Sequence, residues 1–332
     1  MRYESVVLSV SWIPSEAISG MPRLPFQMGI THYDDPPPDT LTDFRPLLAE
    51  DRLRFVNELR AWIDLEDGEI RDAGYSGGGH LNVSTVHLGR MGISFAAARF
   101  PDIQRQPQLD GDRATFVQTA GGRTALPAPR HVHGKPHVQL SAPTVWTTLS
   151  LTIGTDGAAA GSLVGASAFP RHWVYDQSMS LTTKAGVMDF ERWYHESFGA
   201  RTPWGDTDMP AHVVDAETAL ERTVSGQIMR KGRSTVRRLV PEGETVVRQG
   251  DSGDELFLVL DGMLAVEVDG ERVAEVGPGA ILGERAMLES GRRTATLKAV
   301  TPCRLAVARL EDLDRTALEQ ISAGHRREGT PA

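Results

Sequence analysis

The sequence is almost without cysteine, since Cys303 is the one thiol among 332 residues. A chain with a single cysteine forms no intrachain disulfide, and this usage fits a reducing compartment. Long apolar runs are missing as well. Residues 1–14 alternate in the manner of a β-strand, and their apolar run is too short for a signal peptide or a membrane span. We therefore expect a cytoplasmic protein that has no membrane partner.

Basic residues are also fewer than acidic residues. The chain has 35 Lys and Arg against 44 Asp and Glu, and its formal net charge of −9 argues against nucleic acid as a partner. A basic stretch at residues 230–238 departs from this trend, and we interpret it as a solvated helix end that leads into a strand. The sequence shows no repeat with a period of about 20–50 residues, which excludes solenoids and propellers.

Residues 1–205 have the pattern of a β-rich α+β domain. Apolar positions recur at helical spacing over residues 46–64 and predict an amphipathic helix there. Residues 189–198 predict a closing helix that stops at Gly199, and the Pro- and Asp-rich stretch 203–210 predicts a domain boundary. Short apolar runs between Gly, Pro and Asp predict antiparallel strands. These strands are expected at residues 69–76, 115–119, 137–140, 145–153, 162–169 and 180–185.

The remainder of the chain is predicted to be mainly β. Residues 206–234 are expected to form a linker with a helix at about 215–230, and residues 235–322 a tightly wound β-roll with glycine every few positions. Residues 268–271 predict a hairpin turn. One short helix at about 310–322 and a polar tail at 323–332 complete the chain. The predicted fold class is therefore mainly β, and α+β overall.

One short stretch of the predicted β-roll carries polar chemistry. Gly283 and Glu284 precede a single helical turn, and a lone Arg293 follows it. A helix start offers unpaired N–H groups to an anion, and a guanidinium offers a fork of donors to a phosphodiester. A carboxylate beside a phosphate needs another partner, and a ribose hydroxyl supplies one. Together these groups describe a site for a 3′,5′-cyclic nucleotide.

Residues of about 236–310 resemble the cyclic nucleotide-binding domain shared by bacterial catabolite activator proteins and the regulatory subunits of cyclic-AMP-dependent kinase. The resemblance covers the cassette G-E-R-A-M-L-x-x-x-R-R-T-A-T-L at 283–297. It also covers the glycine-punctuated entry to the roll, which consists of Gly243, Gly250, Asp251, Asp254, Leu256, Phe257 and Gly262.

The resemblance implies cAMP or cGMP as the ligand and no metal. It implies that Glu284 binds the ribose hydroxyl and that Arg293 binds the cyclic phosphate. The complete ligand-binding set that it implies is Gly283, Glu284, Arg285, Ala286, Arg293, Thr294 and Ala295.

Three positions or segments depart from the family's pattern. Leu282 stands where the family often has Phe, and it keeps the apolar contact. Thr294 stands where many cAMP binders have Ala and the cGMP binders of the kinase type have Thr. The long helical lid of the family is represented by one short helix, so we expect the base to be exposed or to be covered by another domain or subunit.

Two other readings remain open at this point. In the first, residues 1–205 are a catalytic domain that the sensor regulates, with His80, Arg171 and His172 among the candidate residues. His131, His133 and His137 are candidate metal ligands, although loop histidines beside Arg and Lys explain the pattern better. In the second, the β-roll keeps its fold, binds no ligand and serves oligomerisation.

The reading we prefer is a sensor without assigned catalytic residues, whose partners are an effector protein or a second copy of itself. A transcription factor of the catabolite activator type is disfavoured, because about 20 residues after the roll are too few for a helix-turn-helix.

Overall fold

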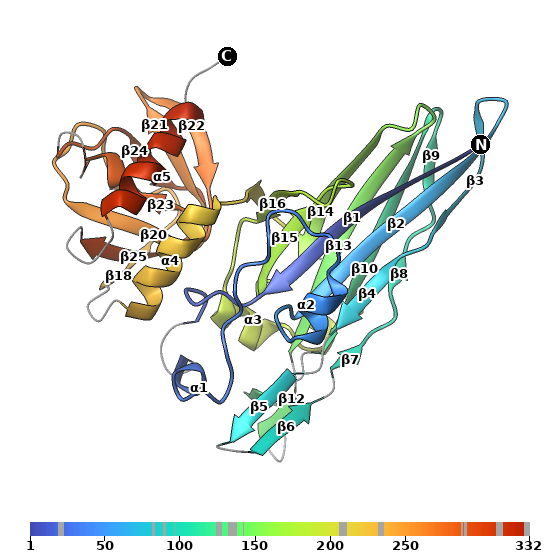
Figure 1. The fold of residues 1–332 in the computed structure, drawn as a ribbon, viewed down its shortest axis with the longest axis horizontal. Coiled ribbons are helices and arrows are strands. Elements are labelled where there is room, and N and C mark those ends of the chain that lie inside the picture. Colours follow the sequence, from blue (N-terminus) through green and yellow to red (C-terminus); the bar gives the residue numbers. More distant parts are fainter. Residues whose placement is uncertain are drawn as a thin grey trace. The chain divides into compact units, whose positions relative to one another are not determined.

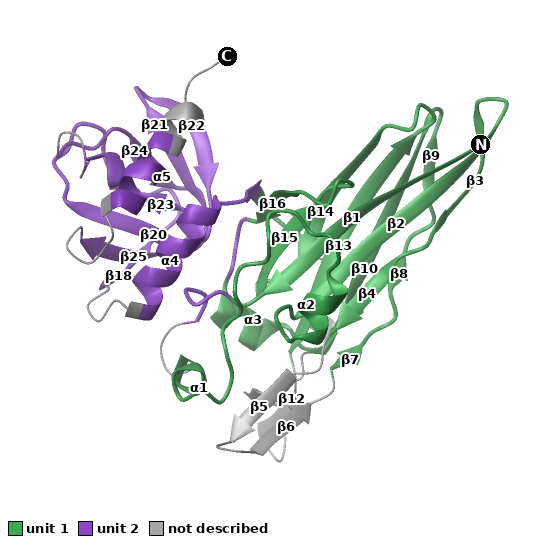
Figure 2. Cartoon of the chain, in the orientation of Figure 1, with its two compact units in different colours: residues 1–13, 19–185, 189–213 green, residues 14–18, 186–188, 214–332 purple. Residues whose placement is uncertain are grey.

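A computed structural model shows that the chain forms two compact units (Figure 2). Unit 1 consists of residues 1–13, 19–185 and 189–213, and unit 2 of residues 14–18, 186–188 and 214–332. The structure describes residues 1–18, 23–81, 84–88, 91–95, 97–123, 128–131, 138–141, 143–205, 211–231, 236–286, 288, 291–309 and 315–328.

Unit 1 is built on two antiparallel sheets (Figure 1). The first has the order β16-β15-β1-β2-β3, and β4 also pairs with β2. Its strands are β1 (Arg2–Trp12), β2 (Phe55–Glu66), β3 (Glu69–Tyr75), β4 (Gly78–Leu81), β15 (Arg171–Tyr175) and β16 (Leu181–Ala185). The second has the order β14-β13-β10-β7, and β8 and β9 also pair with β10. Its strands are β7 (Ala98–Arg99), β8 (Ile103–Gln104), β9 (Gln108–Asp110), β10 (Arg113–Arg123), β13 (Thr144–Gly154) and β14 (Ala159–Ala166).

Shorter elements complete unit 1. The hairpins are β5 (Ser84–Leu88) with β6 (Met91–Phe95), and β11 (Ala128–His131) with β12 (Val138–Ser141). The helices are α1 (Leu24–Gln27), α2 (Arg45–Ala49), α3 (Phe190–Glu196) and a 3-10 turn at Gly199–Arg201. The short strand β17 (Val213–Asp215) contains the point at which unit 1 gives way to unit 2.

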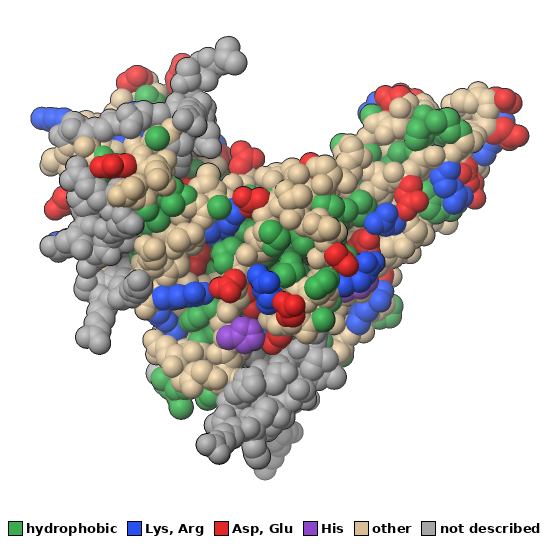
Figure 3. All heavy atoms as spheres, in the orientation of Figure 1, with side chains coloured by type: hydrophobic (Ala, Val, Ile, Leu, Met, Phe, Trp, Pro, Cys, Tyr) green, Lys and Arg blue, Asp and Glu red, His purple; other side chains and the backbone are tan. Residues whose placement is uncertain are grey.

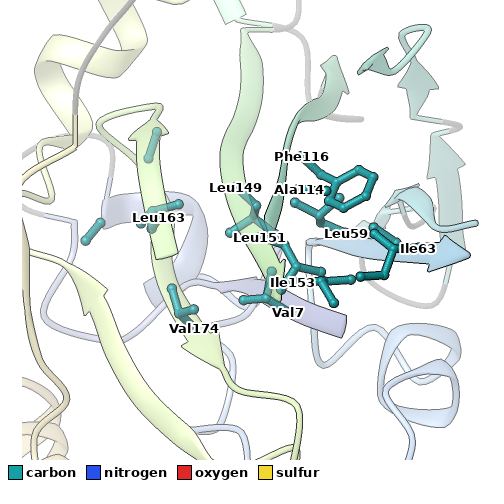
Figure 4. Close-up of a cluster of buried hydrophobic side chains, with 13 residues drawn as sticks. Val7, Leu59, Ile63, Ala114, Phe116, Leu149, Leu151, Ile153, Leu163 and Val174 are labelled. Carbon is teal, nitrogen blue, oxygen red and sulfur yellow. The ribbon is translucent and has the colours of Figure 1, made fainter. Parts of the chain in front are cut away.

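The two sheets of unit 1 bury an apolar cluster between them (Figure 4). Leu59 and Ile63 of β2 contribute to it from one sheet, and Phe116 of β10 and Leu149 of β13 from the other. Because side chains alternate between the faces of a strand, every second residue reaches this cluster. The result is a β-sandwich.

The opposite face of the first sheet is covered as well. Trp12, Val56 and Trp173 on this face pack with Leu41 and Phe44, which come from the segment between β1 and β2. The rings of Trp12 and Trp173 meet edge to face with their centroids 4.9 Å apart. Strand β1 of the first sheet is therefore buried on both sides from Ser5 to Trp12.

The helix predicted over residues 46–64 is wrong. The structure has a five-residue helix, α2, and then the long strand β2. Phe55, Leu59 and Ile63 are four residues apart, and this even spacing places them on one face of a strand as well as near one face of a helix. Pairing of β2 with both β1 and β3 selects the strand.

The other predictions for residues 1–205 agree more closely with the structure. Residues 2–12 form a strand, and each of the six predicted strand segments overlaps an observed one. The closing helix is present as α3, where the side chain of Asp189 accepts a hydrogen bond from the Arg192 N–H and caps the helix. The helix ends at Glu196, three residues before Gly199. The predicted β-rich α+β architecture is confirmed.

Unit 2 is the predicted β-roll. Two antiparallel sheets, β18-β25-β20-β23 and β19-β24-β21-β22, enclose an apolar cluster that includes Phe257, Leu264, Leu297 and Leu305. The turn between β21 and β22 has Asp269 and Gly270 at φ of 54° and 85°, as a tight hairpin requires. The strands are β18 (Val236–Val240), β19 (Thr245–Val247), β20 (Glu255–Asp261), β21 (Leu264–Val268), β22 (Glu271–Val276), β23 (Ile281–Leu282), β24 (Thr296–Ala299) and β25 (Cys303–Arg309).

Two helices cover the outer face of the β20–β25 sheet. Val224 and Ile228 of α4 (Ala219–Lys231) and Leu318 and Ile321 of α5 (Arg315–Glu328) share a cluster with the buried side chains of these strands. The prediction of a helix ending near 322 is wrong, because α5 continues to Glu328. The polar residue types of His325, Arg326 and Arg327 are compatible with a helix, and Gly329 is the first residue after them that disfavours one.

Two short segments from the first half of the chain belong to unit 2. In residues 14–18, the buried Glu16 accepts a hydrogen bond at Oε1 from the Ser225 hydroxyl of α4, over 3.3 Å. In residues 186–188, the Met188 N–H donates to the Asp261 carboxylate over 3.0 Å. Unit 2 is therefore discontinuous in sequence.

Candidate functional site

Arg293 is anchored by its main chain to the loop that precedes β20. Its N–H donates to the carbonyl oxygen of Asp251 over 2.7 Å, and its own carbonyl accepts from the Gly250 N–H over 2.8 Å. The Gly253 N–H donates to the carbonyl of Gly291 over 3.0 Å and extends this pairing. The loop at 250–253 and the cassette at 291–293 are therefore held as a pair of antiparallel segments.

The guanidinium of Arg293 is buried, and its residue is 5% exposed. Nη1 donates to the carbonyl oxygen of Glu255 over 2.8 Å, and Cζ lies 5.1 Å from the centroid of the Phe257 ring. Nε has no hydrogen-bond partner among the described residues. A buried donor without a partner costs free energy, so this atom is available for an acceptor from a ligand.

Carboxylates surround the guanidinium at longer range. Burial lowers the pKa of Arg293, and in decreasing order Glu255, Asp254, Asp251 and Glu284 oppose this shift through their negative charge. An arginine keeps its proton through such a change, so the site presents a positive charge at neutral pH. This charge in a buried slot suits a single anionic group.

Glu284 begins the helical turn of the cassette and is 3% exposed. Gly283, directly before it, has a φ of 92°, which is the left-handed region that favours glycine. A methyl group on Gly283 would lie 2.5 Å from Nη1 of Arg293. The first part of the cassette and its arginine are thus brought together, as the sequence predicts.

The other predicted ligand-binding residues lie around these two. Ala286 is buried, and its carbonyl accepts from the Gly291 N–H over 2.7 Å, which closes the cassette. Arg285 is half-buried on the helical turn. Thr294 and Ala295 are half-buried between Arg293 and β24. Sequence reasoning missed Gly253, which lies against the Arg293 side chain; the signal was a second glycine three residues after Gly250.

The candidate catalytic residues of unit 1 occupy separate places. His80 on β4 lies 3.5 Å from Glu58, and its ring is 5.0 Å from that of Phe44. The pKa of Glu58 is lowered, first by its hydrogen bond to His80. A hollow of about 190 Å³ has Phe44 and Glu58 in its lining, together with other charged and apolar side chains. Acidic and basic side chains are interspersed on the face of the molecule drawn in Figure 3.

His172 lies within the sandwich and is fully buried. Its Nε2 is 3.0 Å from the carbonyl of Ser167, which only accepts, so this nitrogen carries the proton. Nδ1, 2.7 Å from the Ser11 hydroxyl, is then the acceptor. Burial lowers the pKa of His172 to about 4. This is a neutral core histidine with both nitrogens satisfied.

The histidines considered as candidate metal ligands fall largely outside the described residues. His131 is the last residue of β11, and His133 and His137 lie outside the described part of the chain. Within the described part, no three His, Cys, Asp or Glu side chains gather as metal ligands would. Across the same residues, every helix is too short or too polar to span a bilayer.

The family comparison agrees with this geometry. Residues 237–320 match the cyclic nucleotide-binding domain, and this part of the chain is a β-roll of that class.

Among the relatives is a cGMP-dependent protein kinase, egl-4, of Caenorhabditis elegans, which is 23% identical over 284 residues, 84% of this chain and 31% of the kinase. A cAMP-dependent protein kinase regulatory subunit of Yarrowia lipolytica is 37% identical over 79 residues, 24% of this chain and 20% of the subunit. The chain thus spans less than a third of the length of these relatives.

Solved structures with a similar segment include the N-terminal domain of a transcriptional regulator from Streptomyces coelicolor. It has 29% identity and a TM-score of 0.26, and the match covers 31% of this chain and 83% of the regulator domain. The catabolite activator protein of Thermus thermophilus has 31% identity and a TM-score of 0.23, with 28% of this chain and 46% of that protein covered.

Proposed function

We propose that the protein is a sensor of a cyclic nucleotide, cAMP or cGMP, whose binding to unit 2 modulates unit 1. The observation that carries the proposal is the buried Arg293 guanidinium, which has an unpartnered Nε and lies beside the Gly283–Glu284 turn. In this proposal Arg293 binds the cyclic phosphate and Glu284 binds the ribose hydroxyl, within the ligand set named above.

Binding is tested by titrating cAMP and cGMP calorimetrically into the wild type and into Arg293→Ala. The loss of a charge-assisted contact is expected to cost about 1.5 to 3 kcal/mol. Arg272→Ala is the matched control, because Arg272 on β22 is half-exposed, pairs with Glu275 and carries the same charge. If neither nucleotide binds the wild type at millimolar concentration, the β-roll is a structural module without this ligand.

The proposed modulation is supported by the path of the chain. Strand β1 ends at Trp12, and residues 14–18 then dock on α4 inside unit 2. In unit 1, Ile13 is fixed to Asp34 by an exchange of hydrogen bonds of 2.7 and 2.8 Å, and Arg54 binds the Asp34 carboxylate with two donors. A displacement of α4 therefore acts on β1 through Ile13, the one residue between Trp12 and the segment 14–18.

Tryptophan fluorescence tests this modulation. All six tryptophans belong to unit 1, and unit 2 has none. Cyclic nucleotide is expected to change their emission in the wild type, with half of the change at the calorimetric dissociation constant. Binding without any change in emission or in amide exchange of β1 would show that the sensor does not act on unit 1.

The remaining parts of the proposal follow from the sequence. We place the domain of unknown role at residues 1–205 without the segments 14–18 and 186–188, the linker and helix at 206–234, and the sensor from residue 235 to the end of α5 at Glu328. The change from unit 1 to unit 2 at Val213 supports a division in this region. We propose a cytoplasmic location, and an effector protein or a second copy of the chain as the partner.

A further inference from the structure

The side chain of Arg293 passes over the backbone of the loop at residues 250–255 and contacts it at Gly253. Its main chain is bonded to Gly250 and Asp251 at one end of the loop, and its Nη1 is bonded to the Glu255 carbonyl at the other end. Between these points the guanidinium lies against Gly253. The loop and the arginine therefore run across each other at close contact.

A side chain at Gly253 would occupy the place of the guanidinium. A methyl group built there overlaps Nε, Cζ and Nη2 of Arg293. The backbone does not demand glycine here, because Gly253 is not among the residues with positive φ. Gly250 shows the opposite case: its φ is 88°, and a methyl group there would meet nothing within 4 Å. Gly250 therefore allows the turn, whereas Gly253 leaves space for the side chain of Arg293.

We propose that Gly253 is a positioning residue for the anion of the ligand, because its lack of a side chain lets the Arg293 guanidinium lie in its slot. The proposal rests on the proposed function, in which Arg293 binds the cyclic phosphate. In Gly253→Ala the new methyl group displaces the guanidinium and disturbs its hydrogen bond to the Glu255 carbonyl, so some stability is lost together with the orientation of the donors. These donors then no longer point at the phosphate position, and directional donors lose their value when misaligned.

Affinity and stability are measured together for Gly253→Ala. Binding of cAMP and cGMP is expected to weaken at least tenfold, while the protein without nucleotide still unfolds in a cooperative transition. Gly226→Ala is the matched control, because Gly226 lies in α4 of the same unit and its nearest neighbour, the Ser15 hydroxyl, is 4.0 Å from the added methyl group. Its binding is expected to equal that of the wild type.

A double-mutant cycle shows whether Gly253 acts through the arginine. In the Arg293→Ala background, Gly253→Ala is expected to cause less than a twofold further loss, because no guanidinium remains to be displaced. The Arg293 Nε–H resonance gives a readout without ligand, and it is expected to shift in Gly253→Ala and to stay in place in Gly226→Ala.

Each outcome is decisive. Equal losses in both backgrounds, or an unchanged Nε–H resonance, would make Gly253 a residue of the loop alone and overturn the proposal. Wild-type affinity in Gly253→Ala would also overturn the proposal for Gly253, but it would leave the proposed sensor function intact. Absence of binding to the wild type would instead remove the sensor function, and this inference with it.

Discussion

The Nη1 atom of Arg293 donates to the main-chain carbonyl of Glu255, 2.8 Å away, so the guanidinium is oriented by backbone rather than by a flexible carboxylate. A backbone acceptor holds the plane of the guanidinium fixed relative to β20. Nε is left without a partner among the described residues. The arginine is thus pre-oriented before an anion arrives, which lowers the entropy cost of binding.

Arg293→Lys is expected to weaken cyclic nucleotide binding about tenfold or more although it keeps the charge. A lysine ammonium is a point charge and lacks the planar fork that bonds Glu255 and a phosphate at once. Calorimetry with Arg272→Lys as the control measures this difference. Wild-type affinity in Arg293→Lys would mean that charge alone holds the ligand.

Thr294→Ala is expected to lower affinity for cGMP about five- to tenfold and to leave cAMP nearly unchanged. The half-buried Thr294 follows Arg293, and we expect its hydroxyl to bridge the phosphate and the guanine amino group of cGMP, which adenine lacks at that position. The ratio of the two dissociation constants is the measurement. An unchanged ratio would assign base preference to another part of the site.

Ser225→Ala is expected to halve, or reduce further, the nucleotide-induced change in tryptophan emission while binding is retained. The Ser225 hydroxyl is the donor to Glu16, and its loss loosens residues 14–18 from α4. Ser322→Ala on α5 is the control, since Ser322 is also fully buried in unit 2. A full response in Ser225→Ala would mean that this hydrogen bond does not transmit the signal.

His172→Asn is expected to flatten the acid dependence of unit 1 stability. The folded pKa of about 4 lies below the ordinary 6.5, so the unfolded state binds more protons between these values. The stability from neutral His172 is therefore complete above pH 6.5 and is lost as the pH falls towards 4, by about 3 kcal/mol. Asp34, whose pKa is raised to about 6, acts in the opposite sense in both proteins and cancels in the difference.

Urea unfolding at pH 7 and pH 4, followed by tryptophan emission, measures the His172 contribution. The exposed His212 in unit 1 supplies the control His212→Asn. Equal pH slopes for the wild type and His172→Asn would mean that His172 titrates normally in the fold.

Gln118→Met is expected to destabilise unit 1 by about 1 to 3 kcal/mol, because it leaves buried acceptors without a donor. Nε2 of Gln118 donates to Oδ1 of Asn57 over 2.8 Å and to the Glu58 carbonyl over 3.1 Å, inside the sandwich. Urea unfolding measures the loss, and the exposed Gln108→Met is expected to stay within about 0.5 kcal/mol. A loss no larger than this control would show that water replaces the amide.

The β-roll could be predicted from sequence because its signals are local. Glycines at turns such as Gly270, and the spacing from Gly283 to Arg293, depend on a few neighbouring residues. The structure of β2 depends instead on pairing between Phe55–Glu66 and Arg2–Trp12, which are distant in sequence. The spacing of apolar residues in this segment fits both the period of a helix and the period of a strand, so the helix prediction was wrong.

Two contacts within unit 2 could also not be predicted from the sequence. The contact of Gly253 with Arg293 joins positions 40 residues apart, and a glycine that makes room looks the same in sequence as one that turns the chain. The burial of Glu16 on α4 joins residues 209 apart. Neither a motif nor a composition shift marks residues 14–18 as part of the sensor.

The discontinuous sequence of unit 2 determines how the sensor can be isolated or exchanged. A fragment that starts at Val214 lacks the residues that cover Ser225 and the residue that bonds Asp261. Such a fragment exposes a buried helix face and leaves a carboxylate short of a donor. A transferable form of unit 2 therefore has to include residues 14–18 and 186–188 as well as residues 214–332.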